Sequence, residues 1–482
     1  MSQTAQGRRV ATSGHPLATS AGLDVLRVGG SAVDAALAMA FTQWVVAGPT
    51  CGPGGDLVLM HVPRRAGAFA PKVYGGWSRV PHGLQPEDLT SRGPLAAVVP
   101  GALAGADAAW RDCGQLSWPE LFTAALVHAD GHHVTRWMAQ SYATVEAKGN
   151  GAALRAVLDQ DFAPADGDTV SCRRLGASLE RLSTAGANDL YGGLLASKLC
   201  SAASDDGALI DEADLQSMEA VIDVPRSRQL DGLRVSVLPP PSQASITTEL
   251  LAAATPQTDP ITRQFAGQVA ELTRQALIDR CVVGVPGTAA CVAADDESAA
   301  VVIHSLAGVQ YGSGWVAGQT GIALGNRTGT ALSARSDLRG AYPVPGAILP
   351  HTLSAALFES GGRMMLVATP GGDRQVQWLA QAGQRFRLGV PHDLGELVDA
   401  PRWFVCPEGD RFGVPAGIDR EWLMFAEPGI EWRDDAHTAG FAVRPIDNVG
   451  GGLQAITWDD TDGWLAASDH RSGGAAGVAE ED

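Results

Sequence analysis

Apolar residues recur at helical spacing in the first part of the chain. Residues 32–46 carry this pattern directly after Ser31, whose hydroxyl suits the N-terminal cap of a helix. A shorter helix is predicted over residues 21–30, where AGLDVLRVGG closes on two glycines. The apolar run LVLMHV at 57–62 follows a glycine-rich elbow and predicts a buried strand. Residues from about 105 to 215 read mostly as helices.

The pattern changes toward strands in the second half. DGLRVSVLPPP at 231–241 predicts a strand that a run of prolines ends, and helical spacing returns over 244–280. Beyond residue 288, two apolar runs flank the polar segment 295–298 and predict a hairpin. LVATPGGDRQVQWLAQAG at 366–383 predicts a strand, a Gly-Gly turn and a helix. This order predicts sheets covered by helices, an α+β sandwich.

Composition and charge narrow the class of protein. The 482 residues are 45% apolar and 18% charged with a mean hydropathy of +0.02, values typical of a compact globular protein. The net charge of −18 repels a phosphate backbone, so nucleic acid is not an expected partner. No run of 18 apolar residues occurs, and no membrane span is predicted.

The cysteines and histidines suggest neither a disulfide framework nor a metal site. The seven cysteines include no CxxC pair, and the first residues lack the apolar segment of a signal peptide, which together predict a reducing cytoplasm. His132 and His133 are adjacent on a predicted helix or its end, so they point in different directions and lack zinc spacing. No phosphate or dinucleotide loop is present, and we expect no metal and no cofactor.

A Gly-Thr step at residues 287 and 288 suggests a nucleophile. A threonine hydroxyl attacks a carbonyl only when a base takes its proton. If the Gly287–Thr288 bond is cut, the freed α-amine of Thr288 has a pKa of about 8 and serves as that base. Glycine adopts strained backbone angles at low steric cost, which suits a bond that must be distorted and attacked. The alternative is an ordinary turn into a strand.

Such a nucleophile also needs hydrogen-bond donors for the oxyanion that forms on the attacked carbonyl. Gly371 and Gly372 lie in PGGD, between a predicted strand and a predicted helix, so their backbone N–H groups belong to a helix N-terminus. Without side chains, they let a substrate carbonyl approach closely. CGPGG at 51–55 offers similar donors. For either segment a plain turn is the alternative.

A series of motifs runs in order from about residue 10 to about residue 458. They read HPLATSAGLDVLRVGGSAVDAALAMA, CGPGGDLVLMHV, VVPGALAGADAAW, LYGGLLASKL, IDEADLQSMEAVI, LPPPSQAS, YGSGWVAGQTGIAL, ATPGGDRQVQWLAQ and APRWF. Together they resemble the γ-glutamyltransferase family of N-terminal-nucleophile (Ntn) hydrolases. Ser31 stands where the family's GGNAVDAA has Asn.

The resemblance implies a four-layer αββα sandwich that is made as a proenzyme and cuts itself. Cleavage would give a large segment, 1–287, and a small segment, 288–482, which together form one αββα domain. In this family the two pieces stay associated, and a homodimer of such heterodimers is one assembly that the resemblance allows.

An alignment without gaps from YGSG backwards places the family's nucleophile on Thr288. The next two family residues, Thr and His, become Ala289 and Ala290. Gly371 and Gly372 inherit the oxyanion role. The resemblance therefore implies that the one chemically necessary hydroxyl is kept.

The positions that the family uses to hold its substrate differ here. The arginine that binds the glutamyl α-carboxylate falls on Trp77, and we predict that Arg79, two residues further on, takes its place. The groups that bind the α-ammonium fall on Gly308, Arg327 and Thr330. Arg327 and Thr330 are both predicted to bind the substrate. Arg327 favours a second carboxylate or an α-keto acid, and Thr330 puts a hydroxyl where the family has an acid, so the site does not suit an ammonium group, which argues against glutathione. Surface roles for the two arginines are the alternative.

Hydroxyls that assist the family's nucleophile fall on His304 and Leu306, with Ser305 between them. Because an ordinary histidine titrates near neutral pH, His304 is predicted to support the amine or to protonate a leaving group. A core histidine with satisfied nitrogens is the alternative. His351 and Thr352 replace the paired serines of glutamyl enzymes and resemble amidase-type members, so we predict that they contact the substrate.

We therefore predict an autoprocessed hydrolase or acyltransferase. Its substrate is a small anionic acyl compound, with an amide as the commonest target of the family, cleaved through an acyl-enzyme on Thr288. One alternative is hydrolysis of a C–C bond next to a keto group, as is thought for relatives in the alkylproline branch of antibiotic biosynthesis. Another is a catalytically silent member that acts as a binding protein, which Ala289 and Ala290 suggest.

Overall fold

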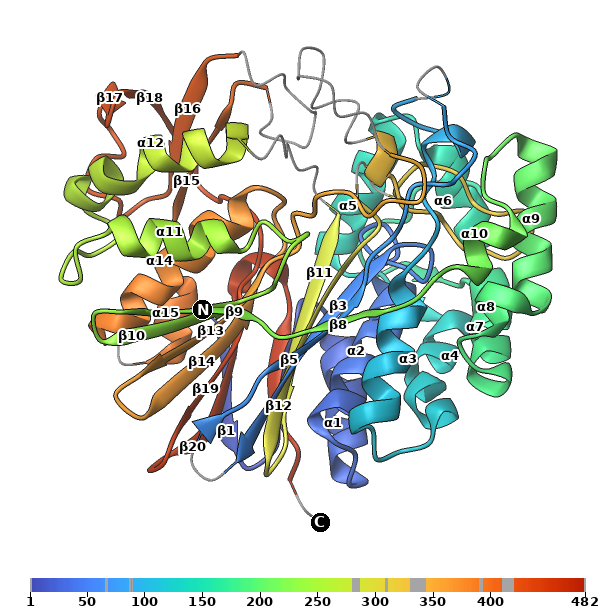
Figure 1. Ribbon diagram of the computed structural model, residues 1–482, viewed down its shortest axis with the longest axis horizontal. Coiled ribbons are helices and arrows are strands. Elements are labelled where there is room, and N and C mark those ends of the chain that lie inside the picture. The colour runs from blue at the N-terminus through green and yellow to red at the C-terminus, as the bar shows by residue number, and fades with distance from the viewer. Residues whose placement is uncertain are drawn as a thin grey trace.

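Two β-sheets stack face to face at the centre of the molecule, and helices cover both outer faces (Figure 1). This computed structural model describes residues 2–65, 68–85, 88, 90–279, 287–307, 311–329, 344–389, 393–409 and 420–480. The layers follow the order helix, sheet, sheet, helix, so the predicted αββα sandwich is confirmed.

The first sheet holds the strand that begins at Thr288. Its order is β21-β2-β11-β12-β3-β5-β8, with β4 beside β3, and neighbouring strands are antiparallel. The strands are β2 (Val10–Ser13), β3 (Asp56–Arg65), β4 (Ala68–Phe69), β5 (Lys72–Gly76), β8 (Val221–Asp223), β11 (Thr288–Ala294), β12 (Ser298–Ser305) and β21 (Ala475–Val478). The predicted hairpin after residue 288 is β11 and β12.

Alternation along β11 explains why its sequence reads as one apolar run. Ala290 and Val292 pack in the core between the two sheets, whereas Ala289 and Cys291 pack against the helical layer. Both faces of the strand are buried, so neither face selects polar residues. By the same alternation, the side chain of Thr288 lies on the face that looks toward the second sheet.

The second sheet has the order β1-β20-β19-β14-β13-β10-β9. Its strands are β1 (Gln3–Gly7), β9 (Arg226–Leu230), β10 (Leu233–Val237), β13 (Ala355–Ser360), β14 (Arg363–Ala368), β19 (Gln454–Asp459) and β20 (Gly463–Ser468). Leu357 and Leu366 meet Val58 and Val292 of the first sheet in one buried core. The strands predicted at 231–241 and 366–383 are β10 and β14.

Helices on the outer face of the first sheet come from the N-terminal half. They are α1 (Pro16–Arg27), α2 (Ala32–Val46), α3 (Ala102–Cys113), α4 (Thr123–Asp130), α5 (Arg136–Ala147), α6 (Gly151–Val157), α7 (Arg173–Ala185), α8 (Asp189–Gly192), α9 (Leu194–Asp206) and α10 (Glu212–Gln216). Ser31 caps α2 as predicted: its Oγ accepts from the Asp34 N–H at 3.1 Å, and the Asp34 carboxylate accepts from the Ser31 N–H at 2.9 Å.

The outer face of the second sheet carries α11 (Ser245–Ala253), α12 (Arg263–Asp279), α14 (Arg374–Leu388) and α15 (Leu394–Asp399). A smaller sheet packs beside α14 in the order β15-β16-β18-β17. Its strands are β15 (Trp403–Pro407), β16 (Trp422–Ala426), β17 (His437–Thr438) and β18 (Phe441–Pro445). The sequence reading did not predict this sheet.

Strands from before and after residue 287 are hydrogen-bonded neighbours in both large sheets. The β11–β12 pair lies between β2 and β3, while β13 pairs with β10 and β20 pairs with β1. The segments 1–287 and 288–482 therefore share both large sheets.

One predicted element is wrong in type. His132 and His133 form the short strand β6 (His132–His133), which pairs with β7 (Thr169–Val170), rather than the end of a helix. Gly131, after α4, breaks the helix because its backbone is extended, at φ 175° and ψ 135°.

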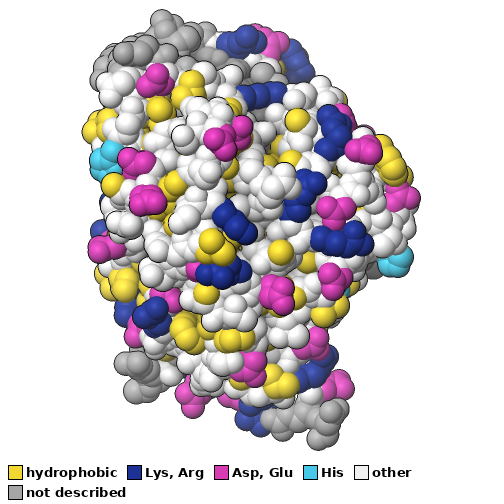
Figure 2. Space-filling model, turned by 90° about the vertical axis from the view of Figure 1, so that its right-hand side faces the viewer, with side chains coloured by type: hydrophobic (Ala, Val, Ile, Leu, Met, Phe, Trp, Pro, Cys, Tyr) yellow, Lys and Arg dark blue, Asp and Glu magenta, His cyan; other side chains and the backbone are white. Residues whose placement is uncertain are grey.

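The surface of the described residues carries both signs of charge. On the face to the right in Figure 1, acidic and basic side chains are interspersed, with hydrophobic side chains scattered among them (Figure 2). None of the described helices joins the length to the apolar character that crossing a bilayer demands.

Candidate active site

Strand β11 has an open edge where it begins. β12 pairs with the whole strand, starting from Thr288 opposite Ser305, but on the other side β2 pairs only with residues 291–294. Gly14 follows β2 and lines a pocket beside this edge of β11. Residues 288–290 therefore face a cavity on one side and a paired strand on the other.

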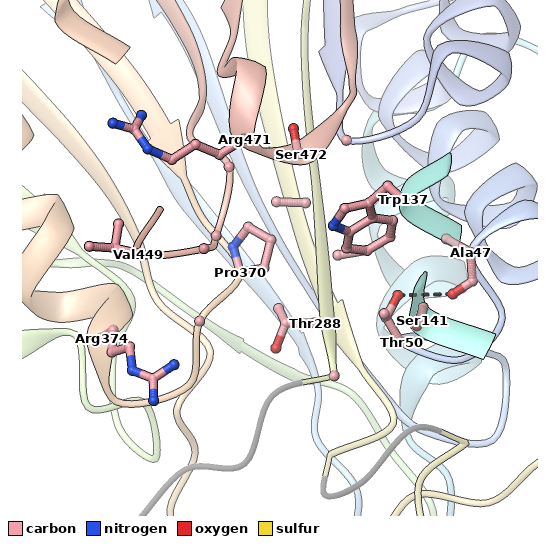
Figure 3. A pocket seen from close by; sticks show the side chains of 18 of the residues that line it. Ala47, Thr50, Trp137, Ser141, Thr288, Pro370, Arg374, Val449, Arg471 and Ser472 are labelled. Atoms are coloured by element: carbon pink, nitrogen blue, oxygen red, sulfur yellow. Dashed lines mark hydrogen bonds between the residues drawn. The ribbon is translucent and has the colours of Figure 1, made fainter. Parts of the chain in front are cut away.

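The cavity has a volume of about 350 Å³ and reaches both Thr288 and Gly371. Figure 3 shows Trp137 and Thr50 on one side of Thr288, and Pro370 and Arg374 on the other. Thr288 is 3% exposed, and within the described chain its Oγ has no hydrogen-bond partner. The hydroxyl is thus buried at the wall of the cavity without a partner that would fix its direction.

Gly371 and Gly372 form the turn between β14 and α14. Their φ angles are +141° and +60°, a region that favours glycine. Their carbonyls start the helix by accepting from the N–H groups of Arg374 and Gln375, each at 3.2 Å, and the Gln243 side chain also binds the Gly372 carbonyl at 3.2 Å. Among the described residues neither glycine N–H donates a hydrogen bond, so both donors are available at the helix N-terminus.

The carbonyl before Thr288 also has a partner. The Ser305 hydroxyl donates to the Gly287 oxygen, and Ser305 Oγ in turn accepts from the Ala307 N–H at 2.8 Å. Gly287 has a φ of +137°, which only glycine adopts readily. The bond predicted to be cut thus follows a glycine at positive φ and has a hydroxyl directed at its carbonyl.

A buried polar cluster lies next to Ser305 on the neighbouring strand β3. Asp56 lies opposite Ser305 on β3, and it accepts from the Ser78 N–H at 2.6 Å and from Arg327 at 3.2 Å. The Nε2 of His351 lies 3.4 Å from the same carboxylate. Burial opposes ionisation, but His351, Arg327 and the Ser78 hydrogen bonds hold the pKa of Asp56 below its usual range. The Asp56 carboxylate therefore brings Arg327 and His351 together. The sequence did not identify Asp56 as a site residue.

His304 lies on the opposite face of β12 from Ser305. Its two ring nitrogens meet the Trp44 N–H at 3.1 Å and the Gln43 side chain at 2.8 Å, both from α2. Burial lowers the pKa of His304 to about 3, so the ring is neutral near pH 7. This environment is that of the core histidine that the sequence also allowed, and His304 does not line the cavity.

The remaining predicted residues lie outside the cavity or outside the described chain. Arg79 is half-buried and its backbone bridges Val99 and Ile348, while Thr352 is buried and its carbonyl accepts from Gln243 at 3.3 Å. Arg327 and His351 do not line the cavity either. Position 330, predicted to bind the substrate, and position 308, on which another ammonium-binding group of the family falls, lie outside the described residues. Substrate contacts by these side chains stay predictions.

Several residues that line the cavity were missed by the sequence reading. Trp137 comes from α5, Trp378 from α14 and Phe404 from β15. Arg374 also lines it, and its guanidinium stacks 4.5 Å from the centre of the Phe404 ring. Arg374 and Trp378 lie in the quoted motif ATPGGDRQVQWLAQ, and Phe404 ends the motif APRWF, so these three could have been considered. Trp137 lies in no quoted motif, and no pattern in the sequence connects α5 with Thr288.

A buried ionic cluster supports the wall that carries Trp378. Arg402 binds Asp469 at 2.7 Å and the Gly451 carbonyl at 2.9 Å, and its guanidinium lies 4.9 Å from the Trp378 ring. Burial lowers the pKa of Arg402 to about 10, so it stays charged at neutral pH. Arg402 and Asp469 are 1% and 0% exposed. Arg471 also binds Asp469, at 3.0 Å, so loss of Arg402 would leave this buried carboxylate with one arginine in place of two.

We expect Arg402→Ala to lower the free energy of unfolding by about 3 kcal/mol, because the buried Asp469 carboxylate keeps only one arginine partner, Arg471 at 3.0 Å, and the Gly451 carbonyl loses its donor. Thermal or urea denaturation followed by circular dichroism measures the change. The control is Arg8→Ala, which removes a pair with Asp296 in which the Arg8 side chain is 77% exposed. Equal midpoints for the two variants would contradict a supporting role for the buried cluster.

The chain is similar to one family model and to several known proteins. A family model described as gamma-glutamyltranspeptidase matches residues 18–284 and 282–479. Oxamate amidohydrolase proenzyme of Klebsiella pneumoniae is 28% identical over 461 residues, covering 82% of this chain and 85% of that protein. Glutathione hydrolase proenzyme of Bacillus subtilis is 28% identical over 252 residues, 49% of this chain and only 42% of that protein.

A solved structure shows the same fold. Cephalosporin acylase from Bacillus halodurans superposes with a TM-score of 0.83 at 21% identity, covering 100% of this chain and 97% of that chain.

Proposed function

Because the chain belongs to the gamma-glutamyltranspeptidase family, we propose that it is an autoprocessed Ntn hydrolase with Thr288 as its nucleophile. Self-cleavage after Gly287 would free the α-amine of Thr288, which then takes the proton of the hydroxyl beside it. The hydroxyl attacks the substrate carbonyl, and the Gly371 and Gly372 N–H groups stabilise the oxyanion. Water or an amine resolves the acyl-enzyme.

The observation that carries this proposal is the meeting of two elements at one cavity. Thr288 at the start of β11 and Gly371 at the start of α14 come from facing sheets and line the same space. A nucleophile and free backbone donors on either side of a cavity are what acyl transfer requires. The silent alternative gives no reason for this arrangement.

The cavity supports a small acyl compound with an apolar part and an anionic group. Trp137, Trp378 and Phe404 offer apolar surface, and Arg374 contributes a cation beside the Gly-Gly turn. Arg327 already faces Asp56 in a buried pair, so the cavity does not depend on it for charge. A relative is named for oxamate, itself a small anionic amide, which makes oxamate a suitable first member of a substrate panel.

Mass spectrometry of the purified protein tests the proposal. We expect two polypeptides, one ending at Gly287 and one beginning Thr-Ala-Ala-Cys, that elute together from a sizing column. Incubation with a panel of anionic amides, from oxamate to amides with aromatic arms, should leave an acyl adduct on the smaller piece. A chain that stays whole and inert would leave the silent binding protein as the better reading.

Ketone compounds belong in the same panel of test substrates. Where the family holds an α-ammonium, this chain has Arg327 paired with Asp56, which does not suit a second cation. Attack of Thr288 on the ketone carbonyl of a β-keto acid would leave an acyl group on Thr288, while the C–C bond breaks and the departing carbon takes up a proton. Adducts from ketones but not amides would favour the C–C hydrolase alternative.

We expect Trp137→Ala to raise KM about tenfold for substrates with an aromatic arm, and to leave KM for oxamate within about twofold. The half-buried ring forms one wall of the cavity, and a ring contact of this kind contributes about 1 kcal/mol beyond its buried area. Steady-state kinetics on both substrates gives the comparison. Trp458→Ala is the matched control, since Trp458 stacks on Arg64 away from the cavity. Equal KM changes in both variants would argue against an aromatic wall.

A further inference from the structure

The carbonyl of the Gly287–Thr288 bond has a dedicated donor. The hydroxyl of Ser305 donates to this oxygen while its own Oγ accepts from the Ala307 N–H at 2.8 Å. The Ala307 N–H fills one lone pair of Oγ, and among the described residues the Gly287 oxygen is the acceptor for the O–H hydrogen. Ser305 is 2% exposed, so water does not compete for this contact.

Two unusual backbone conformations hold this contact together. Ala307 has a φ of +52°, rare for a residue with a side chain, and this turn brings its N–H back onto Ser305. Gly287 has a φ of +137° and presents its carbonyl to the same hydroxyl. A residue with a side chain at positive φ, as Ala307 is, persists where the surrounding structure enforces it, and such residues cluster at functional sites.

The pairing of β11 with β12 fixes the third participant. Thr288 lies directly opposite Ser305, and directly opposed residues in an antiparallel pair carry their side chains on the same face. The attacking hydroxyl, the carbonyl and the donor therefore share one corner of the sheet. The Gly371 and Gly372 donors approach from the facing sheet instead.

We propose that Ser305 is a catalytic residue of the self-cleavage, serving as the oxyanion donor for the Gly287 carbonyl. This inference rests on the proposed function. Thr288 Oγ attacks the Gly287 carbonyl carbon, the C–N bond to Thr288 breaks, and the hydroxyl proton ends on the departing nitrogen, leaving an ester and a free amine. Water then hydrolyses the ester to a Gly287 carboxylate and restores the Thr288 hydroxyl. In both steps negative charge grows on the oxygen that Ser305 already contacts.

The chain therefore has two separate oxyanion sites, one for the self-cleavage and one for the reaction on the substrate. Ser305 serves the peptide carbonyl of the precursor. Gly371 and Gly372 serve the carbonyl of the substrate. His304, which the family alignment had placed beside the nucleophile, has no part in either, because it points to the helical layer.

The test follows the full-length chain after cell-free synthesis, with the appearance of the 288–482 piece measured by gel and intact mass. We expect Ser305→Ala to slow cleavage about 100-fold, since one oxyanion donor contributes about 10²–10³ in rate. Ser305→Thr keeps a hydroxyl and should cleave within about tenfold of the unaltered chain. Ser305→Cys, a weaker donor, should fall between Thr and Ala.

The controls separate this inference from the proposed function. If the unaltered chain is not cut, or if Thr288→Ala is cut equally well, the nucleophile itself is wrong. If the unaltered chain is cut and a folded Ser305→Ala variant is cut at the same rate, the role of Ser305 is overturned and Thr288 stands. Should Ser305→Ala fail to fold by near-ultraviolet circular dichroism, equal rates for the Thr and Cys variants would overturn it instead.

Discussion

Thr288→Ala remains a single chain of 482 residues and has no hydrolase activity. The variant lacks both the hydroxyl that cuts the precursor and the nucleophile of the mature site, so both losses are complete within detection. Alanine fits, because its neighbours in β11 are small and Ala289 and Ala290 already have that side chain. Denaturing gels, intact mass and turnover of an identified substrate measure the two effects.

Two further variants complete that experiment. Thr288→Ser keeps a hydroxyl at the same position and should still be cut. Thr461→Ala removes an exposed threonine from the turn between β19 and β20 and should behave as the unaltered protein. Cleavage of Thr288→Ala at the same site would mean that another group, or a protease, cuts the chain.

Gly371→Ala is cut normally but loses about a thousandfold in kcat/KM. A Cβ at this position would lie 2.4 Å from Cζ3 of Trp378, and the φ of +141° disfavours any residue with a side chain. The turn must therefore shift, which moves the neighbouring N–H groups away from the oxyanion, and each donor contributes about 10²–10³ in rate. Steady-state kinetics on the processed variant gives the loss.

A second glycine separates the loss of donors from backbone strain alone. Gly232 has a φ of +67° in the turn between β9 and β10, with open space where its Cβ would be. Gly232→Ala should cost stability but leave kcat/KM unchanged. If Gly371→Ala loses no more activity than Gly232→Ala, the Gly-Gly turn is not the oxyanion site.

The elements around the nucleophile were predictable because local patterns define them. The hairpin after Thr288, the cap at Ser31 and the strand-turn-helix at Gly371 each depend on residues near in sequence. The layer order followed from the sequence of such elements and from motif resemblance. The small sheet β15-β16-β18-β17 was not predicted, since its order is set by packing against α14 and part of its connection lies outside the described residues.

The substrate contacts were harder to predict, because they depend on facing elements rather than on position in the chain. The alignment without gaps placed His304 beside Thr288. In the structure Ser305, one residue later, lies opposite Thr288, and the His304 side chain points to the other face of the sheet. Arg327 was read as a cation for the substrate, whereas Asp56, far away in sequence, already pairs with it. Trp137 had no mark in the sequence, because α5 reaches the cavity only through the packing of the helical layer.

The pairing of strands from before residue 287 with strands from after it has a kinetic consequence. While the chain is whole, renaturation is a first-order process whose rate does not depend on concentration. After a cut at Gly287, β2 and β3 belong to one polypeptide and β11 and β12 to the other. The sheet can then form again only when the two polypeptides associate, so refolding becomes second-order. Dilution would then slow recovery from denaturant for the cut protein and not for Thr288→Ala. The mature molecule would owe its persistence to a slow rate of opening rather than to reversible equilibrium.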